Sequence, residues 1–458
     1  MASKMLTDFD DISDDKRGVL QRQFEASPFA QHEQDRRPIT LEIFDFDSTL
    51  FLSPLLSPQM WHSSLIKLIT TENLLGPGWW RDTRSLELGP LDELKKSAWA
   101  NFWNESVVES ARKAIQDPNK LVVVLTGRRY HPFHHLIDAM LKAKGLQFDI
   151  IGLRPDPESD DADELGFNTQ PNVFDTTMEF KSLFLINMLA NVPSLENVIM
   201  WDDRVSHVRW FRNYMKTMVA EGLIKHGQMI DVHAVRPRYN PKWEYAVVNN
   251  ILETHNKAIQ SLKHDDERRR ALASTAVVAD CNGTTVSALH QFRLTRIPSA
   301  TIIKLSPEHV QLVKSAFQRQ YTYEISKRER QLKPWERHGA EALEFFGNEV
   351  IVSPSTLPAD KIPYGGLGAP VKIHVIATTR ASYKQGMVLL VSVESAHDQG
   401  DCGKHILPLW YKPSFYTQLY RQSYVWHKIS RNQQKTLDGT VDYARPWGVQ
   451  VADDDNNS

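Results

Sequence analysis

A buried strand that ends in two aspartates is the feature that most constrains this chain. Residues 41–51, LEIFDFDSTLF, begin with apolar residues, continue into Asp45 and Asp47, and end in a Ser-Thr turn. The apolar run predicts a strand inside a sheet, and the polar residues are typical of the loop after it. Ligands of an open parallel sheet bind at this carboxyl edge. We therefore expect an α/β domain with two carboxylates at its binding edge, although such a pair also suits a simple turn or helix cap.

Two further segments place phosphate-binding groups in the same kind of position. Residues 121–129, LVVVLTGRR, predict a second buried strand that ends in Thr126, Gly127 and Arg128. A hydroxyl, backbone amides and a guanidinium can together hold phosphate oxygens. Lys181 stands at the head of an apolar-periodic helix. Its charge can neutralise a phosphoryl group or pair with a carboxylate.

A second acidic pair ends a third predicted strand. Residues 197–204, NVIMWDDR, lead into Asp202 and Asp203. Adjacent carboxylates at a strand end suit a hard ion such as magnesium. Each of these segments has an ordinary alternative, as a turn, a solvated helix residue or a cap. Their common order and context predict one site for phosphate and metal.

The combined motifs resemble those of the haloacid dehalogenase-like (HAD) superfamily of phosphohydrolases. The family pattern is a hydrophobic strand followed by Asp-x-Asp-x-Thr, then a Ser or Thr at a strand end, a Lys and an acidic pair. The matching residues are Asp45, Asp47, Thr49, Thr126, Lys181, Asp202 and Asp203. The resemblance implies a HAD-like (Rossmannoid) parallel sheet with a helical cap insertion.

The resemblance also implies a role for each catalytic residue. Asp45 is the expected nucleophile that forms an aspartyl-phosphate, and Asp47 the acid and then the base. Thr126 and Lys181 are expected to hold the transferring phosphoryl group. A carboxylate can attack phosphorus only when the repulsion between two anions is removed, which explains the need for cations here.

A magnesium ion is the cofactor that the resemblance implies. Its expected ligands are the side chains of Asp45, Asp202 and Asp203 and the backbone carbonyl of Asp47. Whether Asp202 or Asp203 is the main ligand stays open. An Asp at position 47 also implies phosphatase work in place of dehalogenation, because it supplies the acid for a leaving alcohol.

The substrate class is suggested by the Thr-Gly-Arg of the second motif. It is similar to the version in polynucleotide end phosphatases, which makes Gly127 and Arg128 expected substrate-binding residues. A HAD domain of this form followed by a long second domain resembles the fungal proteins described as Swiss Army Knife RNA repair-like HAD proteins. The resemblance implies action on RNA or nucleotide phosphate ends. A small phosphorylated metabolite as substrate, or a non-catalytic scaffold for RNA or protein, are the alternatives.

The length and composition predict several domains. The chain has 458 residues, of which 41% are hydrophobic and 24% charged, with a net charge of −2. We expect a soluble globular protein of two or three domains. The expected parts are a disordered lead-in (1–38), a HAD-like domain (39–262) with a cap insertion at about 53–120, a linker (263–291), an α+β domain of unknown role (292–450) and an acidic tail (451–458).

Several protein classes are disfavoured by the composition. The two cysteines, Cys281 and Cys402, are too few for a disulfide framework or a cysteine zinc site. No stretch has the length and apolarity of a membrane span, and the N-terminus lacks the apolar core of a signal peptide. We therefore expect a cytosolic or nuclear protein without membrane contact; protein partners stay unknown.

Aromatic and histidine residues outside the four motifs allow two interpretations. Trp99 and Trp103 have helical spacing, so they are expected to pack on the core, the alternative being that tryptophans of the insertion stack on substrate bases. His207 is expected on a helix surface. His374 and His405 lie on predicted strands, but neither is followed two residues on by Ser or Thr, so they fit the paired-histidine site of 2H phosphoesterases poorly.

Overall fold

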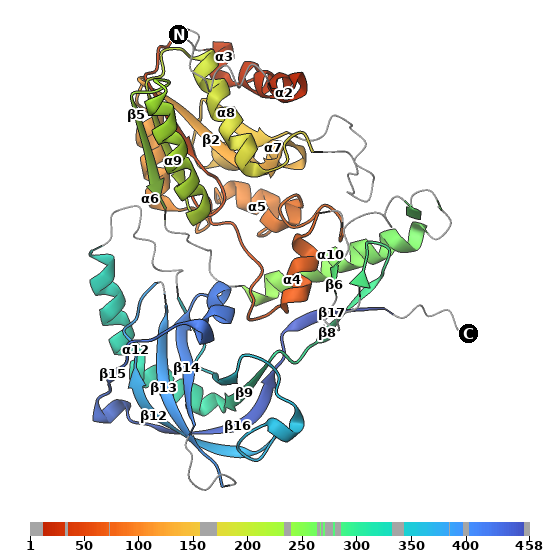
Figure 1. Ribbon diagram of the computed structural model, residues 1–458, viewed down its shortest axis with the longest axis vertical. Helices are drawn as coiled ribbons and strands as arrows, with labels where there is room; N and C mark the ends of the chain where they lie inside the picture. The colour runs from red at the N-terminus through yellow and green to blue at the C-terminus, as the bar shows by residue number, and fades with distance from the viewer. Residues whose placement is uncertain are drawn as a thin grey trace. The chain divides into compact units, whose positions relative to one another are not determined.

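The computed structural model divides the chain into two compact units, shown in Figure 1. The first holds the described residues up to Pro54 and between Gly76 and Pro237; the second holds 55–75 and those from Arg238 onward. The structure describes residues 12–32, 35–72, 74–155, 172–232, 240–262, 266, 269–270, 278–279, 285–331, 343–383, 385–396 and 403–452. None of the described helices combines the length and apolarity of a membrane-spanning helix.

A five-stranded parallel sheet forms the centre of the first unit. Its strand order is β3-β2-β1-β4-β5, so β1 lies between β2 and β4. This confirms the α/β class expected for this half of the chain. The strands are β1 (Thr40–Phe44), β2 (Lys120–Arg129), β3 (Ile150–Arg154), β4 (Asn197–Asp202) and β5 (His226–Asp231).

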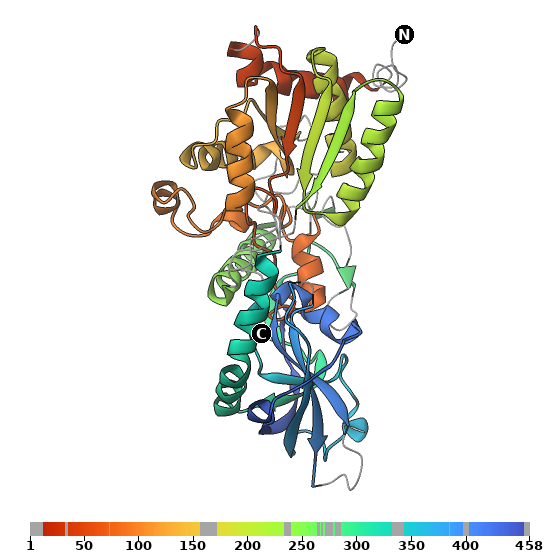
Figure 2. The same cartoon turned by 90° about the vertical axis from the view of Figure 1, so that its left-hand side faces the viewer.

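Helices cover both faces of this sheet. Successive strand residues point to opposite faces, so Leu41 and Ile43 join one core cluster and Phe44 joins another. The first cluster includes residues of α8 and α9, and the second includes residues of α6 and α7, which makes the sheet the middle layer of three (Figures 1 and 2). The helices are α6 (Glu105–Ile115), α7 (Tyr130–Ala143), α8 (Thr177–Asn191) and α9 (Val205–Ala220).

The expectation of a disordered lead-in is wrong for the described residues of that segment. Helices α2 (Asp14–Glu25) and α3 (Pro28–His32) form there, and Leu20 and Phe29 are buried in the core. The amide of Asn187, on α8, donates to the carbonyl of Leu20. This segment has few apolar residues among many charged ones, so its sequence did not indicate an amphipathic helix. Burial of one narrow apolar face is nevertheless enough to pack such a helix on the core.

The insertion after the first motif does not form one cap. Its residues 76–104 stay with the parallel sheet and include η1 (Thr83–Leu86) and α5 (Leu91–Lys96). Its residues 55–75, with α4 (Ser63–Thr70), group with the second unit, as does α10 (Pro241–Ser261), which was expected to end the first domain. The second unit is therefore built from parts that are far apart in the sequence.

A buried carboxylate joins these two parts of the second unit. Oε2 of Glu244, on α10, accepts hydrogen bonds from the backbone N–H of Ser57 and from Nε1 of Trp61, both at 2.9 Å. The indole of Trp61 also stacks on Tyr245, with ring centroids 6.3 Å apart. Burial raises the pKa of Glu244 to about 7, well above its usual 4.5.

Replacing Glu244 by Gln should stabilise the second unit at pH 8 but not at pH 5. Because the folded-state pKa is raised, the neutral acid is favoured, and its contribution is complete below about pH 4.5 and lost as the pH rises through 7. The ionised carboxylate therefore costs about 3 kcal/mol at pH 8. Chemical denaturation at both pH values measures the gain. Glu253→Gln, exposed on the same helix, is the control; an equal gain at both pH values would contradict the argument.

The second unit combines helices with a closed ring of antiparallel strands, which confirms the expected second α+β domain and shows it to be rich in strands. The apolar runs at 300–305 and 387–394 predict strands, which form as β9 (Ala300–Leu305) and β13 (Met387–Glu394). The sequence also predicts a helix at 307–321, which continues to 329 as α12 (Pro307–Glu329). Val313 and Phe317 of α12 pack into the barrel core. The ring runs through β14 (Lys404–Tyr411), β11 (Glu349–Ser353), β9 (Ala300–Leu305), β16 (Thr436–Ala444), β12 (Pro370–Thr378) and β13 (Met387–Glu394), which pairs with β14.

Short strands outside the ring complete the second unit. Two of them, β6 and β7, lie within the predicted linker, most of which falls outside the described residues; the predicted tail does so too, beyond residue 452. The pair β8–β17 is antiparallel, β10 extends the barrel sheet at β14, and β15 pairs with β12. Their bounds are β6 (Val278–Ala279), β7 (Thr285–Val286), β8 (Phe292–Arg296), β10 (Glu344–Phe345), β15 (His427–Lys428) and β17 (Trp447–Val451).

Candidate active site

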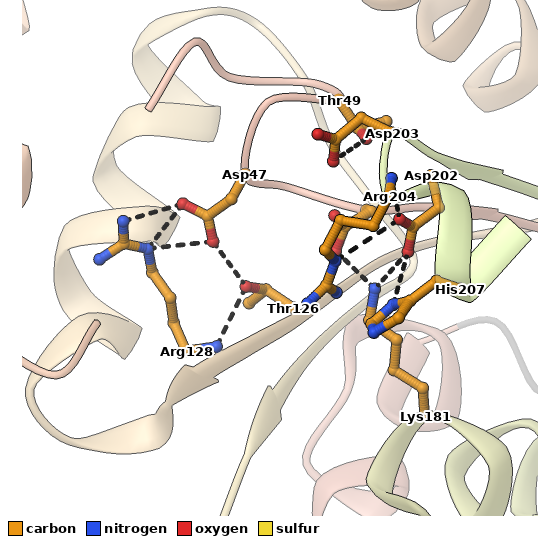
Figure 3. Close-up of polar contacts among 10 residues, drawn as sticks. Asp47, Thr49, Thr126, Arg128, Lys181, Asp202, Asp203, Arg204 and His207 are labelled. Carbon is orange, nitrogen blue, oxygen red and sulfur yellow. Dashed lines mark hydrogen bonds and ion pairs between the residues drawn. The ribbon is translucent and has the colours of Figure 1, made fainter. Parts of the chain in front are cut away.

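The four motifs meet at the carboxyl edge of the parallel sheet. Asp45 directly follows β1, the Thr-Gly-Arg segment ends β2, and Asp202 ends β4. Because β1 pairs with both β2 and β4, these strand ends are neighbours. Lys181 comes from the second turn of α8, which packs on the sheet. Figure 3 shows the resulting cluster of polar side chains.

A buried ammonium joins two of the carboxylates. Nζ of Lys181 lies 2.6 Å from Oδ1 of Asp45 and 2.9 Å from Oδ2 of Asp202. The side chains of Lys181 and Asp202 are fully buried, and that of Asp45 is only 3% exposed. One positive charge thus serves two carboxylates in a place from which water is excluded.

Burial and ion pairing act in opposite directions on these acids. For Asp45, burial raises the pKa by more than Lys181 lowers it. For Asp202, burial also acts upward, but Lys181, a hydrogen bond from His207 and the charge of Arg204 outweigh it and hold the pKa well below its usual range. The negative charge is therefore held most firmly on Asp202.

Three carboxylates are placed where they could hold a metal ion. Asp45, Asp202 and Asp203 each offer an oxygen atom, and these atoms lie within 4.8 Å of one another. The hydroxyl of Thr49 lies 3.5 Å from Oδ1 of Asp203. Hard oxygen donors of this kind fit Mg²⁺, which binds through one or two carboxylates together with waters and substrate phosphate.

The side chain of Asp47 lies apart from this acidic cluster. Its carboxylate accepts from Nε of Arg128 at 2.9 Å, and Oγ1 of Thr126 lies 3.3 Å away (Figure 3). It also accepts from Oγ of Ser53 at 2.6 Å. Burial alone would raise the pKa of Asp47, but the charge and hydrogen bonds of Arg128 lower it below its usual value. Asp47 is therefore held as a carboxylate here.

Arg128 is itself held by residues of the insertion. Its guanidinium is buried, donates from Nη1 to Oγ of Ser85 at 3.0 Å, and lies over the rings of Phe133 and Trp80 at 4.6 and 5.4 Å from their centroids. The expected partner of Arg128 was a substrate phosphate, whereas its partner in the structure is Asp47. The pairing places the guanidinium beside the site in a fixed orientation.

Gly127 allows the end of β2 to approach α8 closely. A Cβ atom at this position would lie 2.6 Å from Cγ2 of Thr177, in the first turn of α8. The backbone N–H of Arg128 donates to Oγ1 of Thr126 at 3.1 Å, which orients the Thr hydroxyl at the strand end. The glycine thus has a packing role, and direct contact with substrate stays a proposal.

Two residues of the cluster were not expected from the sequence. His207 was expected on a helix surface but is buried, with Nδ1 3.2 Å from Oδ2 of Asp202. Nε of Arg204 lies 3.6 Å from Oδ1 of Asp202. Burial alone would lower the pKa of Arg204, but the nearby carboxylates raise it. Their position in the sequence was the signal that could have found them. Both follow β4 closely, Arg204 as the N-cap residue of α9 and His207 in the first turn of that helix.

The tryptophans of the insertion confirm the core interpretation, with one exception. Four of the five are buried and form part of the hydrophobic packing. Trp80, at 39% exposure, is the exception, and it lies beside Arg128. The buried residues are Trp61, Trp79, Trp99 and Trp103.

The histidines of the barrel have separate partners. His374 contacts Oγ1 of Thr436 at 3.1 Å and Oε2 of Glu394 at 3.0 Å. Nε2 of His405 lies 2.5 Å from the hydroxyl of Tyr364. These contacts give each histidine a structural role of its own, in agreement with the poor fit to a paired-histidine site.

The comparisons with known proteins concern the domain that carries this site. Residues 53–257 match the family model of HAD domain family 1 in Swiss Army Knife RNA repair proteins, a match that begins after Asp45 and Asp47. An uncharacterized protein of Saccharomyces cerevisiae is 26% identical over 183 residues, which cover 39% of this chain and 37% of the yeast protein. The chain thus spans little more than a third of that relative.

Solved structures give a more distant similarity. The HAD domain of the effector protein Lem4 from Legionella pneumophila is 12% identical, with a TM-score of 0.25 for an inactive mutant, covering 50% of this chain and 100% of that one. A second structure of the same domain has a TM-score of 0.24 and covers 48% and 97%. The family model and the yeast relative add to two observations made above, the parallel sheet and the four motifs at its edge. Over the domain built on this sheet, the chain is therefore similar to HAD domains in its family-model match and in its motifs.

Proposed function

We propose that this protein is a magnesium-dependent phosphohydrolase that works through an aspartyl-phosphate on Asp45 and acts on RNA or nucleotide phosphate ends. A HAD domain supports phosphohydrolase-type function in general. The observation that carries the finer proposal is the buried contact of Lys181 with Asp45 and Asp202 beside a third carboxylate. A scaffold for binding has no need of this arrangement, because buried charges are costly to keep.

The proposed reaction has two displacements at phosphorus. An Asp45 carboxylate oxygen attacks the phosphorus, the bond to the ester oxygen breaks, and the leaving oxygen takes a proton from Asp47. A water molecule then attacks the phosphorus of the aspartyl-phosphate, gives a proton to Asp47 and releases inorganic phosphate with Asp45 restored. Lys181 stabilises the anionic charge of both transition states from a site without water.

A magnesium ion would be held by Asp45, Asp202 and Asp203, with the backbone carbonyl of Asp47 as a further ligand. Bound there, it would neutralise charge on the attacking carboxylate and on the phosphoryl oxygens. Lys181 already contacts two of these carboxylates and pre-orients them for this purpose. The protein side of the site is thus arranged before substrate binds.

The Asp47–Arg128 pair connects substrate binding with proton transfer. Asp47 needs a proton to act as an acid, and Arg128 opposes protonation. A substrate phosphate that accepts hydrogen bonds from Arg128 would weaken this pair and let the pKa of Asp47 rise. We therefore propose that Arg128 holds substrate phosphate and, by leaving Asp47, prepares the acid for the leaving group.

The first experiment is a phosphate-release assay on 2′- and 3′-phosphorylated oligoribonucleotides and a panel of small phosphomonoesters. We expect release from the RNA ends in the presence of Mg²⁺ and a loss of about a hundredfold or more when EDTA removes the metal. Release from small esters alone would favour a phosphorylated metabolite as substrate. No release from either class would overturn the enzyme proposal and favour a non-catalytic scaffold.

A further inference from the structure

Helix α9 leads away from the acidic cluster and carries an unusual charge pattern. It begins at Val205, three residues after Asp202, on the carboxyl edge of the sheet. The stretch 204–220 contains four basic residues and not a single Asp or Glu, although the chain as a whole has a net charge of −2. Positive charge is thus concentrated on a helix that starts at the candidate site.

Three of these cations share one exposed face of the helix. Arg209, Arg212 and Lys216 have the i, i+3, i+7 spacing of a single helical face and are all exposed. None of them forms an ion pair with another residue that the structure describes. Three exposed lysines elsewhere in the unit, Lys113, Lys142 and Lys225, each pair with a nearby carboxylate, whereas Lys95 and Lys96 form no ion pair with a residue that the structure describes.

An aromatic pair stands beside these cations. The rings of Trp210 and Tyr214 stack with centroids 4.6 Å apart and planes 25° apart. Trp210 is 40% exposed, so part of a large flat ring faces solvent. An exposed indole next to unpaired cations is costly in water and gains contact area when another flat group covers it.

We propose that this α9 surface, formed by Arg209, Trp210, Arg212, Tyr214 and Lys216, binds the RNA strand whose terminal phosphate lies at Asp45. This inference rests on the proposed function. The cations match the phosphates of the strand, and Trp210 offers a stacking platform for a base. The three cations span about 10 Å of the helix axis, which spaces them along an extended backbone.

The positive charge of the α9 surface favours RNA over a protein as its partner. A protein-docking helix usually presents an apolar face to its partner, whereas the continuous row here is cationic. A polyanion with flat bases satisfies both the cations and the indole. An acidic protein segment would use only the cations and would leave the exposed part of the Trp210 ring uncovered.

The test measures binding separately from catalysis. Binding of a fluorescent 3′-phosphorylated oligouridylate to the Asp45→Asn protein is followed by anisotropy at several salt concentrations. The triple change Arg209→Glu, Arg212→Glu and Lys216→Glu should reduce affinity about a hundredfold and make the salt slope shallower by about 2. Trp210→Ala should reduce affinity about tenfold. In protein that retains Asp45, the triple change should leave release from p-nitrophenyl phosphate within about threefold of wild type.

The matched control reverses the same number of charges at the opposite edge of the sheet. Lys113 and Lys142 lie in the last turns of the helices that precede β2 and β3, and Lys225 directly precedes β5. Changing these three to Glu should alter affinity by about threefold at most. Equal losses in both triple variants, or no loss in the α9 variant, would overturn the proposal.

The outcomes also separate this inference from the proposed function. If the wild type releases phosphate from RNA ends but the α9 variant binds RNA normally, the proposed function is supported and the proposed RNA-binding role of the α9 surface is contradicted. If the wild type releases no phosphate but the α9 variant selectively loses RNA binding, the RNA-binding role of the α9 surface is supported and the catalytic proposal is contradicted. Absence of RNA binding by the Asp45→Asn protein would overturn the inference and leave an acidic protein as the alternative partner.

Discussion

Replacing Asp45 by Asn should reduce phosphate release by about a thousandfold or more without changing the fold. The amide has nearly the size of the carboxylate but cannot act as the nucleophile, so no aspartyl-phosphate forms. The side chain is only 3% exposed, and Lys181 keeps Asp202 as its second partner, so the buried ammonium is not left unpaired. Initial rates with RNA ends and with small esters measure the loss, and circular dichroism follows the fold.

The same assay separates the role of Asp45 from that of Asp47. Asp47→Asn should reduce hydrolysis of an alkyl phosphate strongly, because an alkoxide leaves poorly without a proton. It should reduce hydrolysis of p-nitrophenyl phosphate much less, because that leaving group is stable as an anion. Loss after Asp45→Asn should not depend on the leaving group.

A partly buried aspartate outside the site supplies the control for this substitution. Asp149 precedes β3 at the amino edge of the same sheet, accepts from the backbone N–H of Val122 and pairs with Arg36. Asp149→Asn should leave turnover within about threefold of wild type, since it contacts none of the four motifs. Normal turnover by Asp45→Asn, or equal losses in both variants, would contradict the nucleophile assignment.

The strands that carry the site could be predicted because their signals are local. A run of apolar residues that stops at a charged pair indicates both the buried strand and its end, and β1 and β4 stop next to Asp45 and at Asp202. The order of motifs along the chain then indicated that their ends meet at one edge. The same local reasoning located β9 and β13 in the second unit.

The partners within the site could not be predicted, because they depend on contacts between distant segments. The pairing of Arg128 with Asp47 joins residues 81 positions apart, and Ser85 comes from the short helix η1, which has no recognisable motif. Assignment of residues 55–75 to the second unit likewise depends on Glu244, nearly two hundred positions later. Burial of a polar side chain is a tertiary property, and local patterns carry little information about it.

Replacing Lys181 by Met should destabilise the metal-free protein and reduce catalysis. Methionine fills a similar volume but removes the ammonium that lies between Asp45 and Asp202, leaving two buried carboxylates close together. Breaking a buried ion pair on one side costs about 3 to 5 kcal/mol. The loss of transition-state stabilisation should lower turnover about a hundredfold or more.

The loss of stability should depend on pH and on magnesium. In the wild type the pKa of Asp202 is lowered, so its contribution to stability is present above the usual pKa of 3.8 and lost as the pH falls below it. Without Lys181 that contribution disappears, so the variant should differ most from wild type near neutral pH and least in acid. Added Mg²⁺ should restore more stability to the variant than it adds to the wild type, because the ion supplies the missing positive charge.

Lys120→Met is the matched control for this prediction. Lys120 also pairs with a buried carboxylate, that of Glu42 at 2.7 Å, but it lies at the amino end of β2, away from the acidic cluster. Its loss should destabilise the protein without any response to Mg²⁺. If thermal unfolding of Lys181→Met showed the same pH dependence as wild type and no greater stabilisation by Mg²⁺, the lysine would be a packing residue. The carboxylates at this edge would then not form a charge-balanced metal site.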